Sequence, residues 1–139
     1  MYRNSMRIEF PNNSDNERFA RNVAAAFVLE LDPTLDQLSE IKTAVSEAVT
    51  NAIIHGYDSK DGTVTMEGSI VDDTVEFIIS DNGIGISDIR RAREPLFTGK
   101  PEMERSGMGF TIMETFMDRM DVESEVGKGT RITMCKKLK

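Results

Sequence analysis

The strongest structural signal in this sequence is a long helical pattern that begins at Thr34. Thr34 and Gln37 have the spacing of a capping box, in which two side chains satisfy free N–H groups of the first turn. Apolar residues then recur at helical spacing, at Leu38, Ile41, Val45, Ala48, Val49, Ala52 and Ile53. Such a stripe has to be buried against a second layer, and Gly56 after it is expected to form a left-handed cap.

The segments on either side of this helix predict that second layer. An earlier helix is expected to begin at a capping signature formed by Ser14 and Glu17 and to end before Pro33. A short helix over residues 88–93 is expected to be capped by Ser87, and a longer one covers residues 110–120. Strands are expected at residues 7–10, 63–71, 74–80, 121–126 and 130–136, with a hairpin turn at residues 72–73. This order predicts an α/β fold: a two-layer sandwich with one mixed, mainly antiparallel sheet and helices on one face.

Composition and charge limit the classes of function. The chain has 139 residues, of which 39% are hydrophobic and 29% charged, and this fits a single domain over residues 1–139. The sequence contains neither a signal peptide nor an apolar run of about 18 residues, and Cys135 is its only cysteine, so we expect a reduced, cytoplasmic protein with no membrane partner. The net charge of −7 disfavours direct binding to nucleic acid. The basic end, with Lys136, Lys137 and Lys139, is expected to be solvated.

Two polar residues stand within the apolar pattern of the long helix. Glu47 and Asn51 are four residues apart, so they lie on one helical face. A carboxylate can orient and deprotonate an attacking hydroxyl, and an amide oxygen can bind a Mg²⁺ ion that phosphates also ligate. Taken singly, a solvated glutamate and a water-facing asparagine are simpler explanations of these two residues.

Three glycine-containing segments follow in order. In residues 81–85, Asp81 ends an apolar strand and can accept a hydrogen bond from an amino group such as adenine N6, while Gly83 and Gly85 let a flat ligand or a backbone come close. Residues 105–109 open a helix, where backbone N–H groups and Arg105 suit a terminal phosphate. Residues 127–130 end in Thr130, and a hairpin turn is a sufficient explanation of them. Taken alone, the first two segments are also explained by a common turn and a flexible helix start.

Together and in this order, the four segments resemble the N box and the three glycine boxes of the GHKL superfamily, the Bergerat-fold ATPases that include gyrase and the histidine kinases. The resemblance spans residues 41–130 and implies a site for ATP or ADP and Mg²⁺ beneath a mobile lid at residues 94–106. It implies catalytic roles for Glu47 and Arg105, with Asn51 as the metal ligand. The implied nucleotide-binding residues are Asn51, Asp81, Gly83, Gly85, Ile86, Thr98, Ser106, Gly107, Met108, Gly109, Phe110 and Thr130.

Within that superfamily the chain resembles the small stand-alone branch, the anti-sigma factors that are also protein serine kinases, and most closely its sporulation members. A length of 139 residues leaves no room for a transducer domain, and the only histidine lies inside the ATP-site helix, so a phospho-accepting histidine has no candidate. The resemblance implies a homodimer that sequesters a sigma factor of the sporulation sigma-F type and phosphorylates a serine of an anti-anti-sigma protein.

The partner surface is implied by the same resemblance. Residues 6–31 are expected to form the dimer and partner surface, with Arg18 and Arg21 as candidates for partner binding, although ordinary solvated arginines explain both. Gly99 departs from the threonine expected in the lid and should loosen it. Two alternatives stay open: a stress-response anti-sigma kinase of the same branch, and an ATP-dependent binding module without catalysis.

Overall fold

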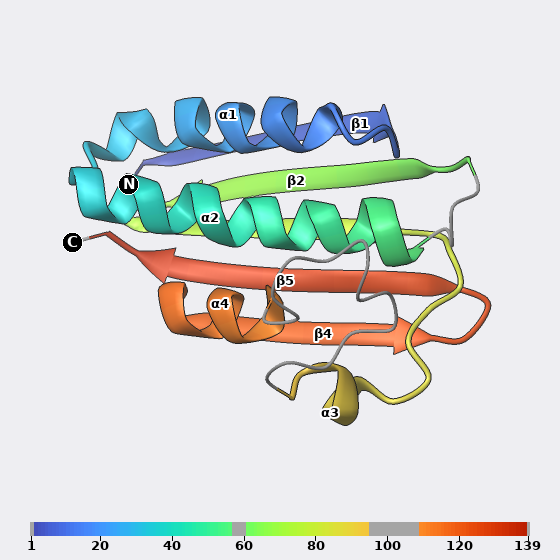
Figure 1. The fold of residues 1–139 in the computed structure, drawn as a ribbon. Helices are drawn as coiled ribbons and strands as arrows, with labels where there is room; N and C mark the ends of the chain where they lie inside the picture. The colour runs from blue at the N-terminus through green and yellow to red at the C-terminus, as the bar shows by residue number, and fades with distance from the viewer. Residues whose placement is uncertain (1, 57–60, 95–108, 139) are drawn as a thin grey trace.

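A computed structural model describes residues 2–56, 61–94 and 109–138, and Figure 1 shows them as one layer of helices over one sheet. The strands are β1 (Arg3–Pro11), β2 (Thr63–Val71), β3 (Thr74–Asp81), β4 (Arg119–Glu125) and β5 (Gly129–Lys137). The helices are α1 (Asn16–Val28), α2 (Leu35–Asn51), α3 (Ile89–Ala92) and α4 (Gly109–Phe116), with a 3-10 turn at Leu29–Leu31 and a π-helical turn at Ala52–Gly56. This order confirms the predicted α/β sandwich.

The sheet has five strands in the order β1-β2-β3-β5-β4. All four pairings are antiparallel, so the expectation of a mixed sheet is wrong for the described residues. The hairpin between β2 and β3 forms at the predicted residues, with Val71 paired to Thr74. Asp72 reaches the turn with a left-handed φ of 54°. Asp is one of the few residues other than glycine that adopt this conformation readily, and this explains why the turn closes without glycine.

The long central helix is built as its sequence predicts. Thr34 Oγ1 accepts a hydrogen bond from the Gln37 backbone N–H at 3.1 Å, and Gln37 Oε1 accepts one from the Thr34 N–H at 2.9 Å. The apolar stripe of α2 is buried, including Ile41, Val45 and Val49. After Asn51 the helix widens into the π-helical turn, and Gly56 at its end does not have a left-handed φ. The predicted left-handed cap is therefore wrong.

Three other helix boundaries differ from expectation. No side chain caps α1: its N-cap is Asp15, and Ser14 contributes only its carbonyl oxygen, 3.3 Å from the Glu17 N. The short helix α3 is capped by Asp88, which accepts from the Arg91 N–H at 3.0 Å, and not by Ser87. Helix α4 ends at Phe116 and β4 begins at Arg119, so the helix predicted to residue 120 stops earlier. The antiparallel pairing of β4 with β5 takes these last residues into the sheet.

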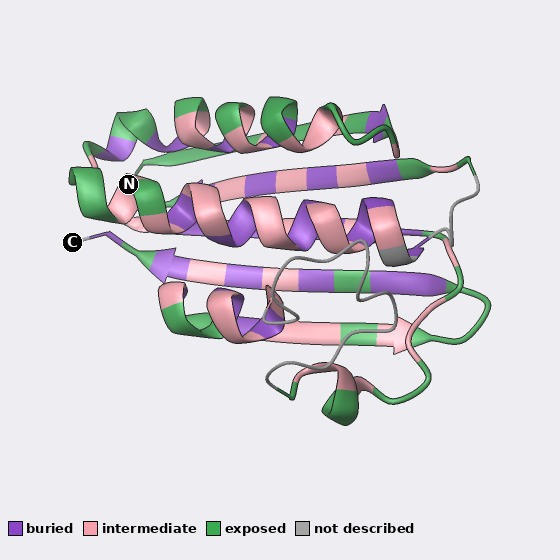
Figure 2. Cartoon of the chain, viewed as in Figure 1, coloured by how far each residue is buried: buried purple, intermediate pink, exposed green. Residues whose placement is uncertain are grey.

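The hydrophobic core lies between the helices and the sheet. Inward-facing strand residues alternate with more exposed ones, as the purple and pink bands in Figure 2 show. Phe77 and Ile79 of β3 are buried against α2, and Met113 brings α4 into the same core. In Figure 1, α1, α2 and α4 all cover one face of the sheet, which leaves the other face without helices among the described residues. No helix of the described residues is long and apolar enough to cross a membrane.

Lys136 belongs to this interior and not to a solvated tail. It is only 9% exposed, and its Nζ donates to the Phe116 carbonyl oxygen at 2.7 Å. Glu40 Oε1 on α2 lies 3.7 Å from the same Nζ. The ammonium group therefore ties β5 to the last residue of α4 and to α2, contrary to the expectation for this residue.

Candidate nucleotide-binding site

The site is built around a row of polar side chains that crosses three strands. Asp81 ends β3 directly opposite Thr130 on β5, and Thr130 lies opposite Ser124 on β4. Directly opposite residues of neighbouring strands project from the same face. Asp81 continues the inward series of Val75, Phe77 and Ile79, so the row lies on the face that the helices cover. This row of hydrogen-bonding groups lies at the end of an otherwise apolar face of the sheet.

Asp81 is a buried carboxylate whose hydrogen bonds come from the backbone. It is 6% exposed, and its Oδ1 accepts the Gly83 N–H at 2.9 Å. Burial raises the pKa of Asp81, and backbone hydrogen bonds from Gly83 and Thr130 act in the opposite direction. A buried acceptor with capacity beyond these two bonds is chemically suited to a ligand amino group.

The glycines of residues 81–85 are required by neighbouring backbone. A Cβ on Gly83 would lie 1.5 Å from the Gly56 carbonyl oxygen, which accepts the Ile84 N–H at 2.6 Å. Gly85 has φ +76°, and its Cβ would lie 2.2 Å from the Glu125 carbonyl oxygen. Of the two possibilities that the sequence left open, a flat ligand or a backbone, the described residues supply the backbone.

Gly56, in the helical layer, also lies where a side chain would collide with a neighbouring group. A Cβ at Gly56 would lie 2.7 Å from the Asp81 Cγ and 2.8 Å from its Oδ2. The end of the π-helical turn therefore packs directly on the carboxyl group. This contact joins the helix that carries Glu47 and Asn51 to the strand that carries Asp81.

Glu47 and Asn51 both lie on α2, where each is half-buried. Glu47 has an interaction partner in the structure. Asn51 is the last residue of α2 before the π-helical turn. Single π turns inside helices are rare and occur frequently at functional sites. The two predicted chemical residues are therefore at the helix end that reaches Asp81.

Ser124 is a member of the site that the sequence did not reveal. Its Oγ accepts the Ile86 N–H at 2.7 Å, which fixes the segment after Gly85. The same Oγ lies 2.9 Å from the Gly129 carbonyl oxygen and 2.9 Å from Thr130 Oγ1. The only signal available in the sequence was the position of Ser124 six residues before Thr130 in a predicted hairpin.

The remaining predicted residues fall into two groups. Gly109 and Phe110 begin α4, and the Phe110 side chain is buried in the core, while Ile86 packs partly against that core. The predicted residues Thr98, Arg105, Ser106, Gly107 and Met108, together with Gly99 and lid residues 95–106, lie outside the described residues. The lid prediction is therefore not tested.

The two candidate partner residues lie apart from this site. Arg18 on α1 is exposed, and Arg21 pairs with Glu17 at 3.2 Å. Helix α1 covers β1 and β2, on the opposite side of α2 from α4 (Figure 1). The arrangement leaves Arg18 on a surface that a macromolecular partner can reach.

A metal ion would have to share its ligands with a nucleotide. Among the described residues no group of three or more His, Cys, Asp or Glu side chains is placed to hold a metal. Mg²⁺ commonly keeps several waters and takes one or two protein ligands together with substrate phosphates. The half-buried Asn51 amide fits that role as a single neutral ligand.

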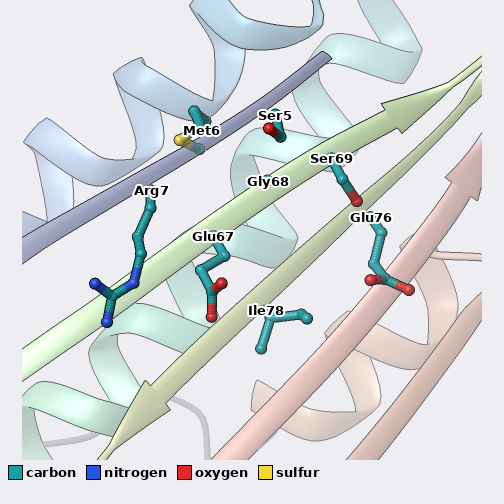
Figure 3. Close-up of a pocket in the computed structure, with 8 residues that line it drawn as sticks. All are labelled: Ser5, Met6, Arg7, Glu67, Gly68, Ser69, Glu76 and Ile78. Carbon is teal, nitrogen blue, oxygen red and sulfur yellow. The ribbon is translucent and has the colours of Figure 1, made fainter. Parts of the chain in front are cut away.

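Among the described residues, hollows also open on the helix-free face of the sheet. One, of about 400 Å³, is lined by residues from β1, β2 and β3, including Arg7, Glu67 and Glu76 (Figure 3). It contains none of the predicted site residues. The other, of about 460 Å³, reaches Asp81 and Thr130 from among outward-facing strand residues. Neither hollow is the helix-side site on which Asp81 and the end of α2 converge.

Comparison with known proteins identifies the family to which the chain belongs. The sequence matches the family described as the histidine kinase-like ATPase domain over residues 10–136, and the chain belongs to that family. The predicted superfamily is confirmed, and with it an ATP-binding domain.

Within that family, curated relatives that match over nearly their whole length are named anti-sigma F factors. The chain is 62% identical over 136 residues to the anti-sigma F factor of Clostridium kluyveri, covering 98% of this chain and 96% of the relative. It is 59% identical over 139 residues to that of Clostridium botulinum strain Eklund 17B, covering 99% and 97%.

Solved structures show the same fold at lower identity. The RsbU and RsbW domains of Rv1364c from Mycobacterium tuberculosis match with a TM-score of 0.71 and 19% identity, over 97% of this chain and 32% of that chain. Full-length ShkA in complex with AMPPNP matches with a TM-score of 0.55 and 20% identity, over 88% and 29%. The chain thus spans about a third of each of these longer proteins, and the likeness shows the fold.

Proposed function

We propose that this protein is an ATP-dependent anti-sigma factor that sequesters a sporulation sigma factor and, as a protein serine kinase, phosphorylates its anti-anti-sigma antagonist. The observation that carries the proposal is the buried Asp81 carboxylate, held by backbone N–H groups beside Gly56 at the end of the helix that bears Glu47 and Asn51. Identity of 62% to an anti-sigma F factor over nearly the whole chain supports the regulatory part. In this role the protein acts in the cytoplasm.

Each described site residue has a distinct chemical task in this proposal. Asp81 accepts a hydrogen bond from the adenine amino group, and the Asn51 amide oxygen is a ligand of Mg²⁺, which neutralises phosphate charge when bound. Glu47 orients the serine hydroxyl of the antagonist and accepts its proton as the serine oxygen bonds to the γ-phosphorus. The bond between that phosphorus and the β–γ bridging oxygen breaks, and ADP leaves. Arg105 is assigned to the γ-phosphate.

The partner surface is proposed on β1 and α1. Strand β1 is an edge strand, so its outer backbone groups are open to pairing with a second copy of the chain. Residues 6–31 would then form the homodimer, and Arg18 and Arg21 would contribute to a face shared by the sigma factor and its antagonist. The alternative to partner binding for Arg18 is an ordinary solvent-exposed side chain. For Arg21 the alternative is a structural role in the ion pair between Arg21 and Glu17.

Two other functions are distinguished by experiment. A stress-response anti-sigma kinase would have the same chemistry but capture a different sigma factor, and the anti-sigma F relatives favour the sporulation partner. A binding module without catalysis would capture a partner without transferring phosphate, and the placement of Glu47 beside Asn51 argues against it.

The test of the kinase is transfer of labelled phosphate from ATP-Mg²⁺ to a purified antagonist. We expect a labelled serine, with transfer by Glu47→Gln reduced at least a hundredfold, the range typical of a lost general base. Nucleotide binding by Glu47→Gln should stay within about twofold of the parent. Glu40→Gln is a matched control on the same helix, outside the site. Equal transfer by Glu47→Gln and the parent would refute the base assignment.

The test of the partner is capture of a sigma factor in the presence and absence of ATP. We expect ATP-dependent binding of the sporulation sigma factor and release when unphosphorylated antagonist is added. Capture of only a stress-response sigma factor would support the first alternative, and capture without any transfer to the antagonist would support the second.

A further inference from the structure

The hydrogen bonds of Ser124 have only one consistent set of directions. A hydroxyl group donates one hydrogen bond and accepts two. The Ile86 N–H can only donate, so Ser124 Oγ accepts that bond at 2.7 Å. The Gly129 carbonyl oxygen can only accept, so the Ser124 proton is directed to it at 2.9 Å.

The direction of the third bond then follows. Ser124 has no proton left for Thr130 Oγ1, which lies 2.9 Å from its Oγ. With all three contacts formed as hydrogen bonds, the Thr130 hydroxyl donates to Ser124 and completes its capacity. The remaining lone-pair capacity of Thr130 Oγ1 is available only for accepting. Thr130 lies directly opposite Asp81, whose ionised carboxylate also only accepts.

We propose that Ser124 is a positioning residue that sets base selectivity by holding the Thr130 hydroxyl in its accepting orientation. The row of Asp81 and Thr130 then presents acceptors alone to the base. A purine with an amino group at position 6 satisfies such a row, whereas a 6-oxopurine brings its own acceptor and finds no donor from these two side chains. This inference rests on the proposed binding of ATP, and assigns its preference over inosine and guanosine nucleotides to Ser124 acting through Thr130.

Burial makes this orientation effective. Thr130 is 6% exposed, so a misdirected proton on its hydroxyl is poorly compensated by bulk water, whereas Ser124 is half-buried and borders a hollow. A site built to pair with a ligand polar group discriminates strongly against an analogue that leaves buried groups unpaired. The bond from the Ile86 N–H to Ser124 also fixes the serine side chain, because it occupies one of the two lone pairs.

The experiment compares ATP with ITP, which has the same sugar and triphosphate but a 6-oxo base. Dissociation constants are measured by calorimetry at pH 8 for the full chain and for Ser124→Ala. In Ser124→Ala the Thr130 hydroxyl is free to rotate and donate to the 6-oxo group, so the preference for ATP over ITP should fall by about fivefold, the value of one ordinary hydrogen bond. Ser124→Thr keeps the hydroxyl and should keep the preference. Ser69→Ala, a strand serine outside the site, is the matched control.

A double-mutant cycle separates this role from general damage to the fold. Thr130→Val removes the hydroxyl and should weaken ATP about fivefold with little change for ITP. In the Thr130→Val background, Ser124→Ala should no longer alter the ATP to ITP ratio. An equal loss of both nucleotides in Thr130→Val, or an unchanged ratio in a folded Ser124→Ala, would overturn the inference while leaving ATP binding intact. Failure of the parent protein to bind ATP would overturn the proposed function itself, and this inference with it.

Discussion

Replacing Lys136 by methionine tests how α4 is held in place. Methionine keeps most of the apolar stem but removes the ammonium group that donates to the Phe116 carbonyl oxygen at 2.7 Å. The side chain is 11% exposed, so water cannot fully replace the lost donor. Phe116 is the last residue of α4, where a cation also interacts favourably with the helix dipole.

The expected loss can be estimated from these contacts. A hydrogen bond that involves a charged group contributes about 1.5–3 kcal/mol net. Glu40 lies 3.7 Å away and is 35% exposed, so losing its attraction adds only a few tenths of a kcal/mol. Because methionine avoids the cost of burying a charge, we expect a net loss of about 2 kcal/mol. With an unfolding entropy of about 2.1 cal/mol/K per residue over 139 residues, this lowers Tm by about 7 °C.

The assay is thermal unfolding followed by circular dichroism, with Lys137→Met as the control. Lys137 is the next residue of the same strand and is exposed, and its backbone N–H donates to Asp118 Oδ2 at 2.7 Å. Lys137→Met should change the free energy of unfolding by less than about 0.5 kcal/mol. Equal shifts in the two variants, or an unchanged Tm in Lys136→Met, would refute the assignment of Lys136 as the anchor of α4.

Three further predictions concern the site and its surroundings. Gly83→Ala places a Cβ 1.5 Å from the Gly56 carbonyl oxygen and should lower the free energy of unfolding, measured by chemical denaturation, by about 3 kcal/mol or more. Gly127→Ala, whose Cβ would have no atom within 4 Å, should lower it by only about 1 kcal/mol through its positive φ, and similar losses in the two variants would contradict the packing argument. Burial and the neighbouring Glu76 carboxylate raise the pKa of Cys135 from 9.0 to about 11. Its alkylation at pH 7.5 should therefore be about 100 times slower than that of an unperturbed thiol, and equal rates would refute the raised pKa. Because burial raises the pKa of Asp81, its accepting form is lost on acidification at a higher pH than for an ordinary carboxyl group. The parent should therefore bind ADP more tightly than Asp81→Asn at neutral pH, and this difference in affinity should shrink as the pH falls. A difference that stays constant down to pH 4 would exclude Asp81 as the anionic acceptor.

The sequence predicted the features that depend on local chemistry. The capping box of Thr34 and Gln37, the apolar stripe of α2 and the β2–β3 hairpin all formed as expected, because short-range patterns determine them. The order of the elements then left few ways to cover one sheet. Asp81 was proposed as a site residue on the same kind of local evidence, since it follows an apolar strand and precedes two glycines.

The incorrect predictions arose where tertiary contacts outweighed a local preference. Gly56 was expected to be required for a left-handed φ. The structure shows instead that a larger residue would collide with the Asp81 carboxyl group, which packs against it. Lys136 was assigned to a solvated end on its charge, although every second residue of its strand faces the core and the strand period would have placed it inside. Ser124 was missed because its contact with Thr130 depends on the register between β4 and β5, which the sequence does not specify.

Variants of the glycines in this site test its packing, whereas variants of its hydroxyl groups test its selectivity for a nucleotide. A Cβ at Gly56, Gly83 or Gly129 would meet the Asp81 carboxyl group or neighbouring backbone at 2.7 Å or less, before any nucleotide is considered. A glycine variant that fails to bind ATP would therefore be equally consistent with a collapsed site and with a lost ligand contact. Ser124 and Thr130 can be changed without new atoms that clash, and the ratio of two nucleotides cancels losses that affect both alike. The chemical role of the site is consequently better tested through the selectivity of its hydroxyl pair than through its most recognisable residues.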